Sequence, residues 1–311
     1  MKSAIVTGAN GFVGSAVVRE LLNSGIKVCA VIHNSASNLP NDPALTIVSS
    51  ELSSMKNLTS TIKTGDYDTF YHFAWEGSAG TARSDYSLQL KNVEYSLDAI
   101  KVAKNLGCSR FVFAGTIMEH EVIQVVYEQG SKPGSNYIYG AGKVATHLMA
   151  QSLAAYLNID LIWTEITNAY GPGEESPRLV NTTIRKCINN ITPKFTSGTQ
   201  NYDFIYIEDL ARAFRLIGEN GKPFNRYLIG SSAAKPLKEF LLEMQNSISP
   251  ELRYDFGNVP FTGVNIPLSY FDTTKTFEDT GFKARISFGE GCKRTKQWMI
   301  NKKGDDNDSK I

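Results

Sequence analysis

The sequence has few of the residues that build metal centres or disulfide frameworks. Its 311 residues include four cysteines and four histidines, with no C-x-x-C pair and no two histidines at ligand spacing. No apolar run approaches the roughly 20 residues of a membrane-spanning helix. No block of lysine and arginine forms a basic arm, and the net charge is only +1. We therefore expect no metal site, no membrane segment and no nucleic-acid partner.

The start of the chain and the spacing of its cysteines predict a cytoplasmic location. A strand pattern begins at the second residue and leaves no room for a signal peptide. Four widely spaced cysteines in a long chain also argue against a disulfide framework. Hydrophobic residues make up 42% of the chain and charged residues 20%, which is the balance of an ordinary globular protein.

Short apolar runs alternate with helical patterns through the first half of the chain. Nearly continuous apolar runs are typical of strands buried on both faces of a parallel sheet. The pattern predicts an α/β fold with a doubly wound parallel sheet and with ligands at the carboxyl ends of the strands. The predicted strands are 4–6, 28–32, 46–48, 69–73, 111–114 and 161–164, and the main helices are 14–24, 85–106 and 139–157.

A glycine-rich loop follows the first predicted strand. Gly8 permits a tight turn, Gly11 lets the backbone approach a pyrophosphate, and Gly14 allows the helix to pack on the strand. The amino end of that helix then offers N–H groups and a positive dipole to phosphates. The loop predicts dinucleotide binding, with further contacts from the residues between the glycines, Asn10, Phe12 and Val13.

The rhythm of the sequence changes after about residue 170, where a Gly-Pro-Gly turn occurs. Later helical patterns cover 178–190, 237–247 and 273–279, mixed with short strands. We expect a dinucleotide-binding domain at 1–168, to which about 203–230 returns, and a smaller C-terminal substrate lobe at 169–303. Residues 304–311 are polar and are expected to form a disordered tail.

The end of the second predicted strand bears on the choice of nicotinamide cofactor. An acidic residue there would bind the ribose hydroxyls of NAD and repel the 2′-phosphate of NADP. The strand ends in His33 and Asn34 instead, which can hydrogen-bond a phosphate, although no arginine stands beside them. NADPH is favoured, with NADH as the alternative. The other interpretation is that these residues only begin a solvated loop.

Tyr139 and Lys143 stand four residues apart and therefore share one face at the start of a helix. Free tyrosine has a pKa of about 10 and is a poor base at neutral pH. A nearby ammonium stabilises the phenolate, so the pair is suited to proton transfer. Lys143 is also long enough to reach a nicotinamide ribose, which makes both residues candidate cofactor contacts.

Several motifs together resemble the extended short-chain dehydrogenase/reductase family of nucleotide-sugar epimerases, dehydratases and ketoreductases, which have a Rossmann fold. The resemblance rests on TGANGFVGS, HFAWEG, the Tyr139–Lys143 pair, NAYGPG, YDFIYIEDLARA and the closing GF…SFGEG…W. It implies that Thr116, just after the fifth strand, completes a catalytic triad and holds the reacting substrate oxygen. Further cofactor contacts implied by it are Glu51, Leu52, Phe73, Ala74, Trp75, Asn92 and Ile166.

The substrate side of the resemblance is less complete. Asn168 matches the family asparagine that bonds the sugar-nucleotide pyrophosphate. Tyr202 stands where the family often has an arginine that pairs with the diphosphate. Arg178 is therefore a candidate phosphate partner, as are Arg83 and Arg253.

The residues after Thr116 bear on the reaction. Family 4,6-dehydratases have an Asp-Glu pair there, whereas this chain has Ile117 and Met118, so dehydration is not expected unless Glu119 substitutes. The strings AGTIMEHE and HFAWEG are more similar to 4-ketoreductases, although His120 replaces their usual tyrosine. We expect reduction of the C4 ketone of a nucleoside-diphosphate 4-keto-6-deoxyhexose for polysaccharide or related sugar synthesis. The specific expectation is dTDP-4-dehydro-6-deoxyglucose reduced to a dTDP-6-deoxyhexose such as dTDP-fucose.

Two alternatives stay open. A UDP-hexose 4-epimerase with tightly bound NAD would share every catalytic residue. A non-catalytic NAD(P)-sensing protein would share the fold, although such proteins usually lack the Tyr–Lys pair. Family analogy further suggests a homodimer, formed through the helices predicted at 85–106 and 139–157.

Overall fold

The computed structural model describes residues 1–33, 38–127, 134–135 and 137–308. The chain divides into two compact units. Unit 1 contains Met1–Ile166, Leu210–Ile229 and Thr273–Phe282, and unit 2 contains Thr167–Asp209, Gly230–Asp272 and Lys283–Ile311. The first boundary falls close to the expected residue 168. The returning segment begins at Leu210 instead of about 203, and a third segment of unit 1 was not expected.

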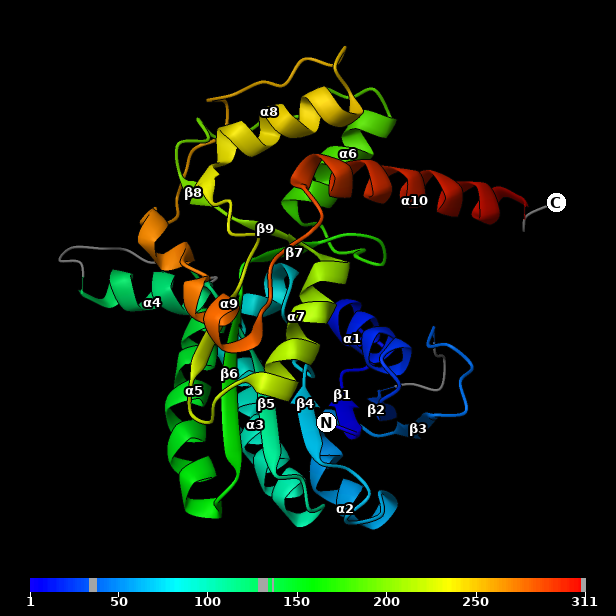
Figure 1. Ribbon diagram of the computed structural model, residues 1–311. Coiled ribbons are helices and arrows are strands. Elements are labelled where there is room, and N and C mark those ends of the chain that lie inside the picture. The colour runs from blue at the N-terminus through cyan, green and yellow to red at the C-terminus, as the bar shows by residue number, and fades with distance from the viewer. Residues whose placement is uncertain (34–37, 128–133, 136, 309–311) are drawn as a thin grey trace. The chain divides into compact units, whose positions relative to one another are not determined.

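A seven-stranded parallel sheet forms the centre of unit 1, with strand order β10-β6-β5-β4-β1-β2-β3 (Figure 1). This confirms the predicted doubly wound α/β fold. The order reverses beside β1, the first strand, as in other doubly wound sheets. The strands are β1 (Ser3–Thr7), β2 (Lys27–Ile32), β3 (Leu45–Ser49), β4 (Thr69–His72), β5 (Arg110–Thr116), β6 (Asp160–Ile166) and β10 (Arg226–Ile229).

Helices connect these strands and cover the sheet. Figure 1 shows the long helices α3 and α5, which pack against each other. The helical elements of unit 1 are α1 (Phe12–Asn23), η1 (Leu52–Asn57), α2 (Leu58–Thr61), η2 (Gly80–Ser84), α3 (Tyr86–Asn105), α4 (Met118–Tyr127), α5 (Tyr137–Leu157), most of α7 (Ile207–Asn220) and α9 (Thr274–Thr280).

Alternate residues of the buried strands face opposite sides of the sheet, as the period of two requires. Phe70 of β4 stacks on Phe111 at 5.3 Å between centroids, in a core cluster that includes residues of α3 and α5. The next residue, Tyr71, points the other way and donates to the Phe214 carbonyl of α7. A Cβ on Gly218 would lie 1.7 Å from the Tyr71 hydroxyl, so glycine is needed there.

Unit 2 contains two small sheets and three main helices. Strand β7 pairs in parallel with β9, and β8 pairs with β11 in antiparallel fashion. Its elements are β7 (Asn168–Tyr170), α6 (Leu179–Ile188), β8 (Asn201–Tyr202), β9 (Phe204–Tyr206), β11 (Lys235–Pro236), α8 (Leu237–Ile248), η3 (Leu268–Phe271) and α10 (Phe288–Asp308).

Helix α10 continues to Asp308, so residues 304–308, which were expected to belong to a disordered tail, are helical in the structure. Residues 309–311 of that tail lie outside the described part of the chain. Within the described residues, none of the helices is both long enough and apolar enough to cross a membrane.

Candidate active site

The glycine loop joins β1 to α1 and has almost no room for side chains. Gly8 has a φ of +65°, and a Cβ there would lie 2.7 Å from the Ala74 backbone nitrogen at the end of β4. A Cβ on Gly14 would lie 2.2 Å from the Gly8 carbonyl oxygen. Gly11 is the N-cap of α1 and contributes no side-chain cap. This cradle fits a pyrophosphate, because the backbone can approach the ligand and the helix amino end faces it.

The residues around the loop have mixed environments. Phe12 and Val13 are half-buried in the first turn of α1. The Asn10 side chain accepts a hydrogen bond from the Asn38 backbone N–H at 3.2 Å. Leu52 is 8% exposed and packs in the hydrophobic core of unit 1. A contact between Leu52 and the cofactor stays a prediction.

The tips of β2 and β3 bring His33 and Glu51 together. The His33 Nδ1 lies 3.9 Å from a Glu51 carboxylate oxygen, and the side chains are 69% and 64% exposed. A carboxylate therefore does stand near the end of β2, although it comes from the segment after β3. Asn34, predicted to contact the cofactor, lies outside the described residues.

Tyr139 and Lys143 project from the first turns of α5 and meet Trp75. The Lys143 ammonium donates to the Ala114 carbonyl at 2.8 Å and lies 3.8 Å from the centroid of the Trp75 ring. The Tyr139 ring meets Trp75 edge-on at 6.0 Å, and its centroid is 5.9 Å from the ammonium. Burial lowers the pKa of Lys143 to about 7, while the charge of Glu119 raises it.

Arg83 adds a cation beside Tyr139, and Glu121 interacts electrostatically with Arg83. The Arg83 guanidinium, on η2, lies 4.5 Å from the centroid of the Tyr139 ring. Arg83 was a candidate phosphate partner, and its position over the tyrosine was not predicted. Burial raises the pKa of Glu121, on α4, to about 7, and the charge of Arg83 opposes that rise. Glu121 was not among the predicted site residues, because nothing in its local sequence distinguishes it from an acidic residue on the surface.

Thr116 ends β5 and is half-buried. Its backbone N–H donates to Glu119 Oε1 at 2.9 Å, and its hydroxyl accepts from the Met118 N–H at 3.3 Å. A hydroxyl that accepts can still donate, so Thr116 can bind a substrate oxygen. At the end of the neighbouring strand β6, the Ile166 carbonyl accepts from the Ile117 N–H at 3.0 Å.

The segment after β4 is held by two buried amides. The side chain of Asn92 accepts from the Glu76 N–H at 3.0 Å and donates to the Glu76 carbonyl at 2.8 Å. Gln89 accepts from the Trp75 indole N–H at 2.8 Å. Asn92 therefore fixes the loop that carries Trp75, and a direct contact with the cofactor stays a prediction. The backbone of Phe73 bonds that of β1, with its N–H donating to the Thr7 carbonyl at 3.2 Å.

The substrate candidates of unit 2 are bonded within their own unit. The Asn168 side chain donates to the Asp203 carbonyl at 2.9 Å. The Tyr202 ring stacks on Phe204 at 5.7 Å, and Arg178 pairs with Glu174 at 3.4 Å. Their contacts with a sugar nucleotide stay predictions.

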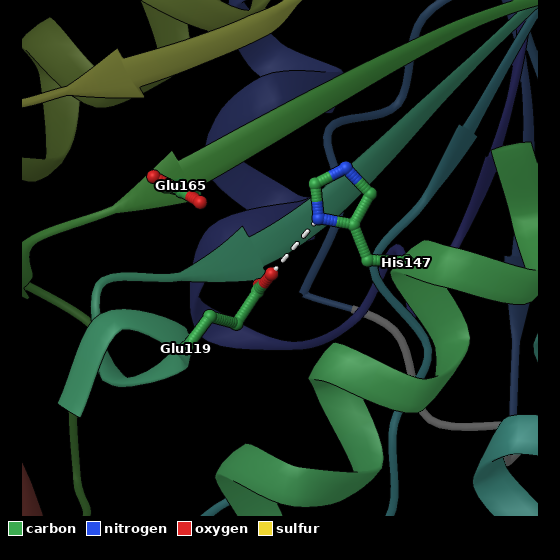
Figure 2. Close-up of side chains that lie close together, drawn as sticks. All are labelled: Glu119, His147 and Glu165. Carbon is green, nitrogen blue, oxygen red and sulfur yellow. Dashed lines mark hydrogen bonds and ion pairs between the residues drawn. The ribbon is translucent and has the colours of Figure 1, made fainter. Parts of the chain in front are cut away.

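Behind Thr116 lies a buried group of acids and histidines (Figure 2). Ligand atoms of Glu119, His147 and Glu165 all lie within 4.8 Å of one another, which is a set of donors that could hold a metal ion. Each of the three already has a polar partner: Glu119 and His147 bond each other, and Glu165 bonds His120, which lies outside the set. His147 Nδ1 is 3.2 Å from Glu119, and His120 Nε2 is 2.8 Å from Glu165. The site was not predicted, because its members are far apart in the sequence.

Comparison with known proteins gives relatives that span nearly the whole chain. A trifunctional UDP-glucose 4,6-dehydratase/UDP-4-keto-6-deoxy-D-glucose 3,5-epimerase/UDP-4-keto-L-rhamnose-reductase of Arabidopsis thaliana is 23% identical over 96% of this chain. The match covers 47% of the plant protein, so the chain spans about half its length. A CDP-abequose synthase of Salmonella typhimurium is 25% identical over 92% of this chain and 95% of that protein.

The fold is also that of solved structures. A UDP-N-acetylglucosamine 4-epimerase from Methanobrevibacter ruminantium, in complex with UDP-N-acetylmuramic acid, superposes with a TM-score of 0.82 at 21% identity. That likeness covers 97% of this chain and 99% of the epimerase. The sequence profile of the NAD dependent epimerase/dehydratase family matches residues 4–230. The protein is therefore a member of the NAD dependent epimerase/dehydratase family.

Proposed function

We propose that the protein acts on a nucleotide sugar and reduces the C4 ketone of a nucleoside-diphosphate 4-keto-6-deoxyhexose with NADPH. The best specific candidate is dTDP-4-dehydro-6-deoxyglucose, reduced to a dTDP-6-deoxyhexose such as dTDP-fucose. The trifunctional plant relative, whose name includes UDP-4-keto-6-deoxy-D-glucose 3,5-epimerase and UDP-4-keto-L-rhamnose-reductase, supports the substrate class, and the CDP-abequose synthase supports a nucleotide sugar. All four cysteines are free, as in a reducing compartment, which supports the cytoplasm as the location.

The observation that carries the proposal is the buried ammonium of Lys143 between the Ala114 carbonyl and the rings of Trp75 and Tyr139. A fixed cation beside a phenol makes that phenol a better proton donor and acceptor near neutral pH. Tyr139 then gives its proton to the oxygen that becomes the C4 hydroxyl, and Thr116 holds that oxygen by a hydrogen bond. A bound NADPH, with its pyrophosphate held by the glycine cradle, would supply the hydride to C4.

The residues beyond Thr116 support reduction over dehydration. Ile117 and Met118 carry no acid or base for removing water. Glu119, which could have substituted, is 2% exposed and accepts hydrogen bonds from the Thr116 N–H and the Trp163 indole. Both of its oxygens are engaged inside the protein, so it is poorly placed to exchange protons with a sugar.

One observation favours a second candidate, a UDP-hexose 4-epimerase with tightly bound NAD. The Glu51 carboxylate beside His33 can bind the free ribose hydroxyls of NAD and repel a 2′-phosphate. An epimerase returns the same hydride and keeps its cofactor, whereas a reductase exchanges its cofactor at every turnover.

The experiment that separates the two uses the purified protein with NADPH and several 4-keto nucleotide sugars. We expect it to purify largely free of nicotinamide, to consume one NADPH per sugar reduced, and not to interconvert UDP-glucose and UDP-galactose. Tightly bound NAD together with UDP-hexose interconversion and no absorbance change would support the epimerase instead.

We further propose a homodimer formed through α3 and α5. These two adjacent helices expose large apolar side chains, including Tyr86, Leu90, Leu148 and Tyr156, which are 63% to 86% exposed. Apolar side chains gathered on one surface are typical of protein interfaces. Sedimentation equilibrium should show a dimer, and Leu148→Glu should shift it toward monomer. A monomer in the natural protein would contradict this proposal.

A further inference from the structure

Glu119 lies at the centre of the buried group behind Thr116. It stands in the first turn of α4, and its Oε1 accepts the Thr116 backbone N–H at 2.9 Å. The Trp163 indole N–H lies 3.2 Å from both carboxylate oxygens. Figure 2 shows the His147 ring pointing its Nδ1 at the same carboxylate, at 3.2 Å. Three donors from β5, β6 and α5 therefore converge on one side chain.

Gly115 leaves the space that this arrangement needs. A Cβ on Gly115 would lie 2.5 Å from Glu119 Oε1 and 2.4 Å from Trp163 Nε1. The φ of Gly115 is not in the left-handed region, so its backbone conformation alone does not demand glycine. The Thr164 carbonyl oxygen would also lie 2.4 Å from that Cβ, so the residue before the candidate catalytic threonine must be small both for the neighbouring strand and for the contact of Glu119 with Trp163.

His147 is fixed from both sides of its ring. The ring stacks on Trp163 with centroids 4.0 Å apart and planes 2° from parallel. The Gln151 amide nitrogen lies 3.2 Å from His147 Nε2. If that nitrogen donates, the neutral imidazole carries its proton on Nδ1 and donates it to Glu119. The partners of Glu119 are thereby held rigidly in place.

Glu119 and Lys143 hold the end of β5 together. Lys143 donates to the Ala114 carbonyl at 2.8 Å, while Glu119 accepts from the Thr116 N–H two residues later. Lys143 is 4% exposed and Glu119 is 2% exposed. In such a place a carboxylate acts on an ammonium more strongly than it would in water.

We propose that Glu119 is a positioning residue for the reaction: by accepting the Thr116 backbone N–H it fixes the end of β5, whose Ala114 carbonyl binds Lys143. The proposal rests on the roles proposed above for Thr116, Lys143 and Tyr139. Glu119 itself touches neither substrate nor cofactor and acts through those residues.

The proposal has a consequence for pH dependence. The titratable groups that face Lys143 are Glu119 from α4, Tyr139 from α5 and His72 from β4, and Arg83 lies against Tyr139. Burial, followed by the charge of Lys143, lowers the pKa of His72 to about 3, so His72 stays neutral above pH 5. Burial lowers the pKa of Lys143 and Glu119 opposes that shift. Loss of the Glu119 charge should therefore lower the pKa of Lys143 further.

The test compares Glu119→Gln with the natural protein and with two matched variants. Glu119→Asp keeps the charge but shortens the reach to Thr116. Glu165→Gln is the second matched variant. It removes a carboxylate that is as buried as that of Glu119 but that bonds His120 and Arg226 instead of Thr116. For each we would measure kcat and KM against pH, and nicotinamide affinity against pH. The pH dependence of nicotinamide affinity tests the role of Glu119 even if the sugar substrate is wrongly assigned. This is because Lys143 is a candidate contact of the cofactor ribose.

We expect Glu119→Gln to lower kcat by about 10-fold to 100-fold with little change in the KM of the sugar, the scale expected for a misplaced catalytic group. The alkaline decline of both kcat and cofactor affinity should move to lower pH. Glu119→Asp should lose kcat but keep the pH profile, and Glu165→Gln should keep both. Unchanged profiles in Glu119→Gln, or the same change in Glu165→Gln, would overturn the proposal.

Two further measurements keep the proposal open to contradiction. If Glu119→Gln does not fold, Trp163→Phe can be tested instead. It removes one hydrogen-bond donor to Glu119 and keeps an aromatic ring against His147. A kcat of Trp163→Phe equal to that of the natural protein would count against the proposal. Activity lost on treatment with a chelator and restored by Zn²⁺ would show that Glu119, His147 and Glu165 hold a metal, and would also overturn it.

Discussion

The carboxyl ends of β5 and β2 each carry an acid and a base, in opposite surroundings. At the end of β5, the side chains of Glu119 and Lys143 lie in the interior, in residues that are 2% and 4% exposed. At the end of β2, the side chains of Glu51 and His33 are 64% and 69% exposed and 3.9 Å apart. Both ends belong to the same sheet of unit 1 and face the same edge, with β4 and β1 between them.

The difference shows that burial gives the two strand ends, which lie at the same edge of the sheet, different electrostatic properties. In the interior a charge is weakly screened, so burial moves the pKa of Lys143 to about 7, and the charge of Glu119 opposes that shift. At the exposed tip, water and salt screen the charges and leave interactions of about 0–1 kcal/mol. We infer that the β5 end controls the rate of proton transfer, while the β2 end only adjusts the choice of cofactor.

The largest effect should come from Tyr139→Phe at the buried end. The change removes only the hydroxyl and keeps the ring that packs between Trp75 and Arg83. Turnover should fall by roughly 10²–10⁴, the usual contribution of a general acid. Cofactor affinity should stay near that of the natural protein, because the ring and Lys143 are still present. Steady-state kinetics and cofactor titration on the same preparation check both parts.

A matched change at Tyr137, two residues earlier on α5, is the control. Tyr137→Phe also removes one hydroxyl near the start of the helix but is not expected to remove the acid. Near-normal turnover in Tyr139→Phe, or an equal loss in Tyr137→Phe, would mean that the proton donor is a different group. Glu121 would then be the next residue to test, since burial raises its pKa to about 7.

The strands and the glycine cradle could be predicted from the sequence because their causes are local. Buried parallel strands have continuous apolar runs, and the requirement for glycine at positions 8 and 14 follows from the turn itself. The spacing of Tyr139 and Lys143 puts them on one helix face, and the structure does bring them together at Trp75. Trp75 and Thr116 became candidate site residues through the family motifs, because the spacing of residues alone does not indicate them.

The parts that were not predicted depend on contacts between distant residues. Glu119 meets Trp163 across 44 positions and His147 across 28. Glu119 stands in the string AGTIMEHE, but no local pattern marks Trp163 or His147 or indicates that the three meet. The resemblance made Glu51 a candidate cofactor contact, but its approach to His33 depends on the register of β2 with β3. A carboxylate therefore lies beside the end of β2, where the sequence of that strand had indicated none.

The smallest effects should come from the exposed end, where His33 and Glu51 act on a 2′-phosphate in opposite directions. We expect the natural protein to use NADPH at least as well as NADH. His33→Asp should shift the ratio of kcat/KM values toward NADH, since it adds a negative charge beside the phosphate. Glu51→Gln should shift it toward NADPH by removing one. Each shift should be about 2-fold to 10-fold, in line with screened surface charges.

Salt and a charge-conserving variant sharpen this last test. Both shifts should shrink as ionic strength rises, because exposed charges are screened within about 10 Å at 0.1 M salt. Glu51→Asp keeps the charge and should leave the ratio close to that of the natural protein. A natural protein that ignores NADPH while using NADH well would show that the β2 tip has been misread. If instead either substitution lowered turnover about 100-fold with both cofactors, on the scale of the losses expected at the buried end, the exposed tip would be part of the catalytic machinery. The contrast between the two ends of the sheet edge would then be wrong.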